Sequence, residues 1–184
     1  MTVQALKRRF TVEEFHRMRQ AGVLSEDDRV ELIDGEVVTM TPIGPRHASC
    51  VRRLIAVLSP LVGDAAIVDA QTPLLLGEYA EPQPDVVLLK PRPDFYRQAH
   101  PGPSDALLVI EVADTSATRT LKVPLYARAG IAELWVINLS EGLVEVYCQP
   151  AGGEYGEHVA AGRGTSLPVP GLGTLQVAVD AVLA

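Results

Sequence analysis

Apolar and polar residues follow one another with strand-like or helical spacing in short segments, and each segment predicts one element. Thr11 opens a Thr-Val-Glu-Glu capping box, so we expect a short helix to follow it and to end at Gly22. Asp34 and Gly35 separate two apolar runs, and such a pair is typical of a two-residue hairpin turn. The pattern therefore predicts a β-hairpin over residues 29–40.

Two further helices are expected, over Arg46–Leu61 and Thr120–Ala129. Pro124 fits the second only in its first turn, which would place Lys122 at the helix N-terminus. Residues 91–105 hold four prolines and a glycine and predict a loop. The other apolar segments predict strands near residues 66–70, 73–76, 83–89, 107–112, 133–139, 143–149, 155–160 and 172–179. This order favours one α/β domain over residues 1–184, with helices on the faces of a mixed sheet.

The composition is that of an ordinary globular protein of 184 residues, of which 47% are hydrophobic and 21% charged. No apolar run approaches the roughly 18 residues that span a membrane. Residues 1–9 lack the apolar segment of a signal peptide. Cys50 and Cys148 have no metal-ligand spacing, so we expect a reduced, cytoplasmic protein with no membrane partner.

The net charge is −7, which counts against a protein that coats nucleic acid, because phosphate contacts need a basic surface. A nuclease is compatible with this charge, since bound cations offset a carboxylate-rich metal site and a local basic patch can coexist with an acidic whole. Other chemistries lack their motifs: the sequence has no Walker-type phosphate loop, no G-x-S-x-G elbow and no Cys/His cluster of zinc spacing.

Two acidic residues interrupt apolar, strand-like segments. Asp85 opens the run Asp-Val-Val-Leu-Leu, and Glu111 lies within Leu-Leu-Val-Ile-Glu-Val. An ionised carboxylate in a buried strand is costly unless it is paired or holds a metal. Lys122 follows Glu111 by eleven residues, and together the three predict a phosphodiesterase site in which the acids hold Mg²⁺. The alternatives are a turn aspartate at a strand entrance and a structural salt bridge from Glu111 to Arg119, Lys122 or Arg128.

Further candidates are indicated by their positions. Glu31, on the expected hairpin, is a third acid, and its alternative is an exposed edge residue. Arg46 and His47 open the second expected helix, where they would contact phosphate or water; for the histidine, a neutral exposed side chain is the alternative. Tyr126 follows Lys122 by four residues and shares its helix face, and we expect it in the core.

Seven segments carry a resemblance to a known family. In chain order they are Thr11–Phe15, Val30–Val38, Pro45–His47, Glu81–Val86, Leu108–Val112, Lys122–Ile131 and Glu133–Asn138. Together they resemble the Uma-type family of "putative restriction endonucleases", which is placed in the PD-(D/E)xK nuclease superfamily. The resemblance covers nearly the whole chain. It implies a restriction-endonuclease-like core, in which helices flank a central mixed β-sheet.

The resemblance also implies roles for individual residues. Asp85 and Glu111 match the metal-binding acids of the superfamily motif, and Glu31 matches a further acidic position. The lysine of the motif normally lies two residues after the second acid, where this chain has Ala113; the resemblance implies that Lys122, on the following helix, takes its place. The connector that leads to this lysine is shorter than in family members and lacks their common Tyr-Asp pair.

The expected function is that of an endonuclease that uses Mg²⁺ or Mn²⁺ to hydrolyse phosphodiester bonds in DNA. Asp85 and Glu111 would ligate the metal, and Glu31 would support a second ion or position water. Lys122 would orient or deprotonate the attacking water and stabilise the charge on the phosphate. One alternative is a nuclease fold kept as a non-catalytic binding or regulatory module. Another is a homo-oligomer with purely structural acids. A homodimer would suit cleavage of both strands.

Overall fold

A six-stranded mixed sheet forms the centre of the protein in the computed structural model, which describes residues 7–25, 27–40, 42–113 and 117–183. All neighbouring strands are antiparallel except β5 and β6, which are parallel. In spatial order the strands are β3 (Ile67–Asp69), β4 (Val86–Leu89), β5 (Ala106–Ala113), β6 (Glu133–Asn138), β7 (Leu143–Ala151) and β8 (Glu154–Ala161). The α/β class with a mixed sheet, expected from the sequence, is confirmed.

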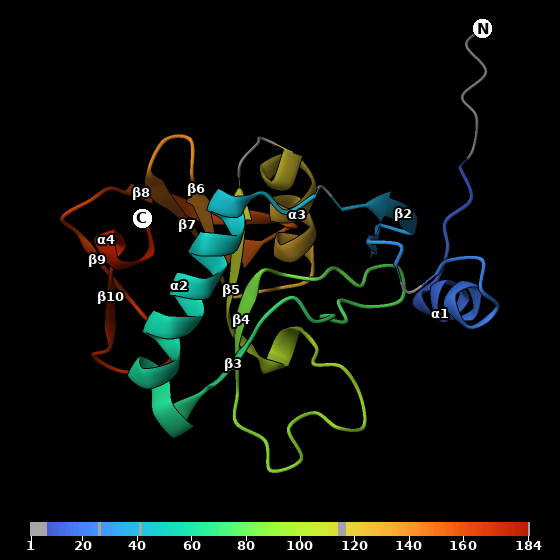
Figure 1. Ribbon diagram of the computed structural model, residues 1–184, viewed down its shortest axis with the longest axis horizontal. Helices are drawn as coiled ribbons and strands as arrows, with labels where there is room; N and C mark the ends of the chain where they lie inside the picture. The colour runs from blue at the N-terminus through green and yellow to red at the C-terminus, as the bar shows by residue number, and fades with distance from the viewer. Residues whose placement is uncertain (1–6, 26, 41, 114–116, 184) are drawn as a thin grey trace, which may run out of the picture.

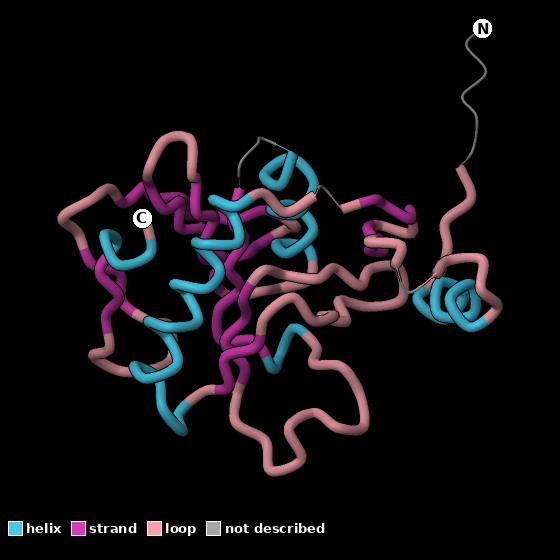
Figure 2. Tube along the Cα trace, in the orientation of Figure 1, coloured by secondary structure: helices cyan, strands magenta, loops and turns pink. Residues whose placement is uncertain are grey.

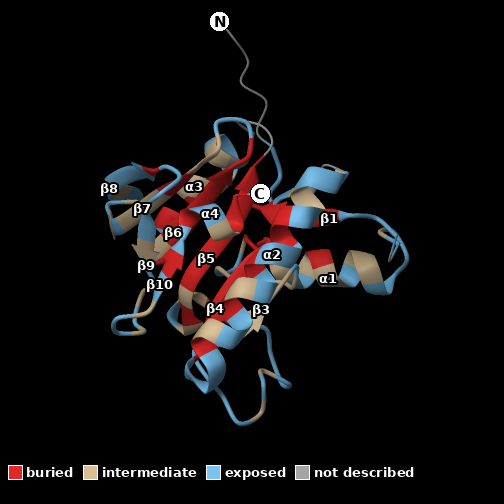
Figure 3. Cartoon of the chain, turned by 60° about the vertical axis from the view of Figure 1, so that its left-hand side comes forward, coloured by how far each residue is buried: buried red, intermediate tan, exposed pale blue. Residues whose placement is uncertain are grey.

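Helices cover both faces of this sheet (Figure 1). Helix α2 (Pro45–Val62) and the short α4 (Val179–Val182) pack on one face, and α3 (Ala117–Arg128) packs on the other. Successive residues of a strand point to opposite faces, so β4 and β5 are apolar on both sides and supply side chains to two cores. Figure 3 shows the buried residues concentrated along β4, β5 and β6.

The N-terminal part follows its sequence signals closely. Thr11 caps α1 (Val12–Gln20) through a complete capping box. Strands β1 (Val30–Ile33) and β2 (Glu36–Thr39) form the expected hairpin, and its turn residues Asp34 and Gly35 have φ of 50° and 80°. Figure 2 shows α1 and the hairpin to one side of the central sheet. An antiparallel bridge between Leu32 and Glu81 attaches the hairpin to the segment that leads into β4.

Two strand predictions are corrected by the structure. No regular strand forms at 73–76. Leu74 and Leu76 donate to the carbonyls of Pro82 and Ala80 on one neighbouring segment, but Pro82 has no N–H to donate back, so the bonds do not extend into a ladder. Of the strand expected over 172–179, only β10 (Gln176–Ala178) forms; it pairs with β9 (Ser166–Pro168), and α4 follows it directly. Short 3₁₀ turns, η1 (Gly63–Ala65) and η2 (Pro103–Asp105), complete the described elements.

The start of α3 also differs from the prediction. The helix begins at Ala117, so Pro124 lies inside it and Lys122 lies in its middle, not at its N-terminus. A proline inside a helix removes one backbone hydrogen bond and crowds the preceding turn. The turn after Pro124 is nevertheless packed tightly, since Leu125 and Tyr126 are buried there. Tertiary packing thus stabilises a helix that begins earlier than the preference of proline for the first turn would predict. Residues 114–116 of the expected connector lie outside the described residues.

Candidate active site

The strand register brings the two predicted acids together. Asp85 precedes β4, whose first residue, Val86, pairs with Ile110 of β5. Continuing this antiparallel register by one residue places Asp85 across from Glu111. The backbone N–H of Val112 donates to Asp85 Oδ2 at 2.8 Å, which closes this end of the ladder. Both carboxylates are buried, with exposed fractions of 8% for Asp85 and 3% for Glu111.

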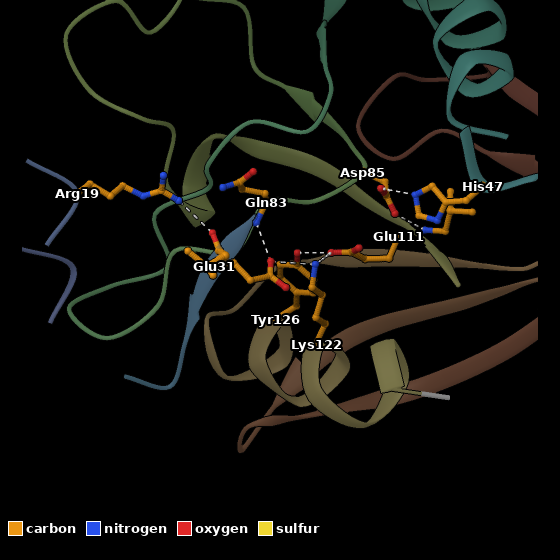
Figure 4. A network of polar contacts seen from close by, with 10 residues as sticks. Arg19, Glu31, His47, Gln83, Asp85, Glu111, Lys122 and Tyr126 are labelled. Carbon is orange, nitrogen blue, oxygen red and sulfur yellow. Dashed lines mark hydrogen bonds and ion pairs between the residues drawn. The ribbon is translucent and has the colours of Figure 1, made fainter. Parts of the chain in front are cut away.

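Helix α3 supplies the partners of Glu111. Lys122 Nζ lies 3.1 Å from Glu111 Oε1, and the Tyr126 hydroxyl donates to the same oxygen at 2.6 Å. The two residues are four apart, so they stand one turn from each other on the same helix face. Tyr126 lies in the core, as expected, and its hydroxyl also belongs to the site. The position of Lys122 in mid-helix therefore directs its amine onto the second acid (Figure 4).

Glu31 reaches the same lysine from the hairpin. Its Oε2 lies 3.1 Å from Lys122 Nζ and accepts a hydrogen bond of 3.0 Å from the backbone N–H of Gln83. The bridge between Leu32 and Glu81 holds β1 against the segment that leads to Asp85, which explains how the hairpin delivers this acid. Glu31 is 5% exposed, so the alternative of an exposed edge residue is wrong.

His47 and Arg46 occupy the first turn of α2. His47 Nε2 lies 2.8 Å from Asp85 Oδ1, so this histidine joins the site through the first acid. Arg46 donates from its guanidinium to the carbonyl of Leu139 at 2.8 Å, just beyond the end of β6. Figure 4 shows His47 approaching Asp85 from the side opposite Lys122. The structure thus groups Lys122, Tyr126, His47 and Glu31 around Asp85 and Glu111. The Arg46 side chain is directed to Leu139 instead.

The two arginines that the sequence offered as partners for Glu111 bind elsewhere. Arg119 pairs with Glu145 at 2.7 Å, and Arg128 pairs with Asp34. Of the three cations considered, Lys122 is the one in contact with Glu111. The salt bridge expected as an alternative is therefore present, and it lies within the group of acids expected to form the site.

The charges of the site are unbalanced. Burial raises the pKa of Glu111 to about 7, with smaller contributions from the neighbouring Asp85 and Glu31, although Lys122 opposes the shift. Burial also acts to lower the pKa of Lys122, but the carboxylates, Glu111 foremost, outweigh it and hold that pKa above its ordinary value. The pKa of the Tyr126 hydroxyl is raised by burial and by Glu111. Three acids thus face one lysine, which leaves an excess of negative charge.

This donor set fits a hard divalent cation in its chemistry. Mg²⁺ prefers carboxylate oxygens and usually keeps several waters, so two protein carboxylates suffice for it. Asp85 and Glu111 offer such oxygens side by side, and a cation would offset the excess negative charge. In the ranges that the structure describes, no group of three or more His, Cys, Asp or Glu side chains is arranged to hold a metal ion. Lys122 lies between Glu31 and Glu111, which keeps the third acid on the lysine side.

Some members of the site were not predicted. The backbone N–H groups of Gln83 and Val112 hold Glu31 and Asp85 in place, and a sequence does not indicate which main-chain donors a side chain will meet. The Pro-Gln-Pro run before Asp85 carries one signal: the two prolines have no N–H, so Gln83 supplies the one backbone donor of this run.

A family model described as "Putative restriction endonuclease", named Uma2, matches residues 12–180. The chain belongs to the Uma2 family. The matched range includes every residue of the site, from Glu31 to Tyr126. The resemblance found in the sequence is thereby confirmed.

The Uma2 chain is also similar to a solved structure described as a "putative nuclease belonging to DUF820 from Anabaena variabilis ATCC 29413". The TM-score is 0.72 at 18% sequence identity, over 95% of this chain and 97% of that chain. This likeness confirms the restriction-endonuclease-like fold. No curated protein matches the sequence. Among the described residues of this Uma2 protein, no helix is both long and apolar enough to cross a bilayer.

Proposed function

We propose that this Uma2 protein is an endonuclease that depends on Mg²⁺, or on Mn²⁺ in its place, and hydrolyses phosphodiester bonds in DNA. The observation that carries the proposal is the placement of Asp85 across from Glu111, with Lys122 bound to the second acid. Two buried carboxylates across from each other, one of them paired with a lysine, suit the binding and cleavage of a phosphate ester. The family description supports a nuclease, and the DNA substrate and the metal belong to the proposal.

Each residue has a defined part in this proposal. When bound, the cation would polarise the phosphate and lower the pKa of a water. Asp85 and Glu111 would hold that cation through their carboxylate oxygens. His47 fixes Asp85 by its contact with Oδ1, which leaves the carboxylate one defined orientation. Glu31 would hold the lysine and position water at the edge of the site.

Lys122 acts in this proposal as a cation and not as a base. Its two carboxylate neighbours keep the amine protonated at neutral pH, because they raise its pKa. An ammonium group has three N–H donors. Among the described residues, Glu111 and Glu31 are its ion-pair partners, so a third donor can face a water or a phosphate oxygen. Lys122 would therefore orient the attacking water and stabilise the charge that develops on the phosphate.

The alternative, a nuclease fold that binds without cleaving, has two observations in its favour. The described residues contain no preformed group of three metal-ligating side chains, and the lysine already neutralises part of the acidic charge. In such a module, Glu31, Lys122 and Glu111 would be a buried ion network that holds the hairpin on α3. Divalent-cation affinity separates the two readings, because the network needs none.

The experiment is a cleavage assay on single- and double-stranded DNA and RNA with Mg²⁺, with Mn²⁺ and with a chelator. We expect metal-dependent cleavage of DNA that is lost in Asp85→Asn and in Glu111→Gln. Glu154→Gln is the matched control, since Glu154 is an exposed acid at the start of β8. Cleavage that persists unchanged in Glu111→Gln would contradict the proposal. An inactive wild type with no cation affinity would favour the binding module.

A further inference from the structure

Besides Asp85, a further buried acid lies in the same row of the sheet as Glu111. In the parallel pairing of β5 with β6, Glu111 is opposite Val136, and in the antiparallel pairing of β6 with β7, Val136 is opposite Glu145. Directly paired residues point to the same face, so both glutamates face α3, two strands apart. Glu145 is 4% exposed. Glu111 and Glu145 are therefore two buried carboxylates of one row that α3 covers.

Several donors surround Glu145. The Arg119 guanidinium and the Asn138 amide donate to Oε1 at 2.7 Å and 3.1 Å, and the Tyr147 hydroxyl donates to Oε2 at 2.6 Å. His158 Nε2 lies 3.8 Å from Oε2. A buried carboxylate with this many donors is held rigidly, because each bond would have to break for it to turn. Glu145 is therefore a rigid attachment point for Arg119 of α3.

Helix α3 is attached to both acids by the same face. Arg119 and Lys122 are three residues apart, which makes them neighbours on the helix surface. Arg119 binds Glu145, and Lys122 binds Glu111. The helix is thus fastened at two points of one row, and it can neither slide along the row nor rotate without losing an ion pair.

We propose that Arg119 and Glu145 are positioning residues that set the amine of Lys122 against Glu111. Lys122 lies on a helix, whereas Glu111 lies on the sheet, so the position of its amine depends on how α3 is held against the sheet. The ion pair between Arg119 and Glu145 holds the helix there. A displacement of about 1 Å at a reacting group can reduce a rate by about 100-fold. The consequence for cleavage rests on the proposed function, whereas the placement of Lys122 can be measured without any activity.

The first test follows the lysine itself. The chain contains three lysines, Lys7, Lys90 and Lys122, so competitive acylation followed by mass spectrometry reports each amine separately. Lys122 is buried and bound to two acids, whereas the other two are exposed references. We expect Lys122 to be acylated at least tenfold faster, relative to these references, in Glu145→Gln and in Arg119→Gln than in the wild type.

Two controls separate a shifted helix from a damaged fold. Asp34→Asn removes the ion pair with Arg128 at the far end of α3 and should leave the acylation of Lys122 unchanged. Cys50, a buried residue of α2 on the opposite face of the sheet, reports global opening through its reaction with a thiol reagent. Its reactivity should stay at the wild-type level in all three variants. Unchanged acylation of Lys122 in both Glu145→Gln and Arg119→Gln would overturn the proposal. Acylation that rises only together with the reactivity of Cys50 would overturn it too.

The second test uses cleavage once it is detected. If Glu145 acts through Lys122, then Glu145→Gln lowers kcat by roughly tenfold or more with KM unchanged, and it causes no further loss in a Lys122→Ala background. Additive losses in the double variant would overturn the proposed route through the lysine. Failure of the proposed function would instead appear as an inactive wild type, and the acylation result would still decide the placement of Lys122.

Discussion

Asp85 and Glu111 lie opposite each other at the end of the β4–β5 ladder, one residue beyond the pair of Val86 with Ile110. The two acids come from segments 26 residues apart in sequence, and the antiparallel pairing alone makes them neighbours. Like charges at this spacing in a buried position repel, which is one reason why the pKa of Glu111 rises. The pair of opposed acids that suits a cation therefore lowers the stability of the folded protein when no cation is bound.

The stability of the protein should decline with pH because of Glu111. Its pKa in the folded state is about 7, above the ordinary value of 4.5, so the folded protein binds this proton more tightly than the unfolded chain. The contribution is fully present below about pH 4.5 and is lost as the pH rises through 7. We expect urea unfolding in the presence of a chelator to show that the free energy of unfolding of the wild type falls by up to about 3 kcal/mol between pH 5 and 8, relative to that of Glu111→Gln. Equal slopes for the two proteins would contradict this.

A divalent cation should stabilise the folded protein through the two opposed acids. A ligand that binds only the folded state adds about 2.7 kcal/mol at 100 times its Kd. We expect Mg²⁺ and Mn²⁺ to raise the Tm of the wild type but not that of the double variant Asp85→Asn with Glu111→Gln. Glu154→Gln should respond as the wild type does. A rise of equal size in the double variant would place the cation elsewhere.

Much of the fold was predictable because its signals are local. The capping box at Thr11, the hairpin turn at Asp34 and Gly35, and the apolar runs around Asp85 and Glu111 each identify an element from neighbouring residues alone. The restriction-endonuclease-like arrangement followed from the family resemblance. The roles of the site residues stay predictions, although the structure brings the acids and the lysine together.

Other features depended on tertiary contacts that no local pattern carries. Pro124 favours a helix that starts late, but packing begins α3 at Ala117 and moves Lys122 to its middle. Glu145 stands between two valines in an alternating strand, where period two predicts a solvent-facing side chain. It is buried because α3 covers that face and Arg119 neutralises it. Neither outcome could be obtained without knowing which helix lies on which face.

Removing the charge of Lys122 should destabilise the protein strongly. Lys122→Met leaves Glu111 and Glu31 buried without their shared cation, and breaking a buried pair in this way costs about 3–5 kcal/mol. The double variant Lys122→Met with Glu111→Gln should recover a large part of that loss, because one of the uncompensated charges is gone. Urea unfolding at pH 8 measures both. A double variant as unstable as the sum of the single changes would show that the charges are not coupled.

Tyr126 offers the most selective change in the site. Its hydroxyl donates to Glu111 Oε1 at 2.6 Å, while its ring is fully buried, so Tyr126→Phe removes one donor and leaves the packing intact. Loss of a hydrogen bond to a charged group costs about 1.5–3 kcal/mol. Because this bond acts to lower the pKa of Glu111, its removal should raise that pKa further and move the pH dependence of stability upward.

The matched control is Tyr96→Phe, which removes a hydroxyl bound to the Lys90 carbonyl in the exposed loop before η2. We expect this change to leave the pH dependence of stability untouched. In cleavage assays, Tyr126→Phe should lower kcat more than it changes KM, since a misplaced Glu111 affects the step after binding. If both tyrosine variants shift the pH profile equally, the hydroxyl of Tyr126 does not tune the acid, and its place beside Glu111 is a packing feature only.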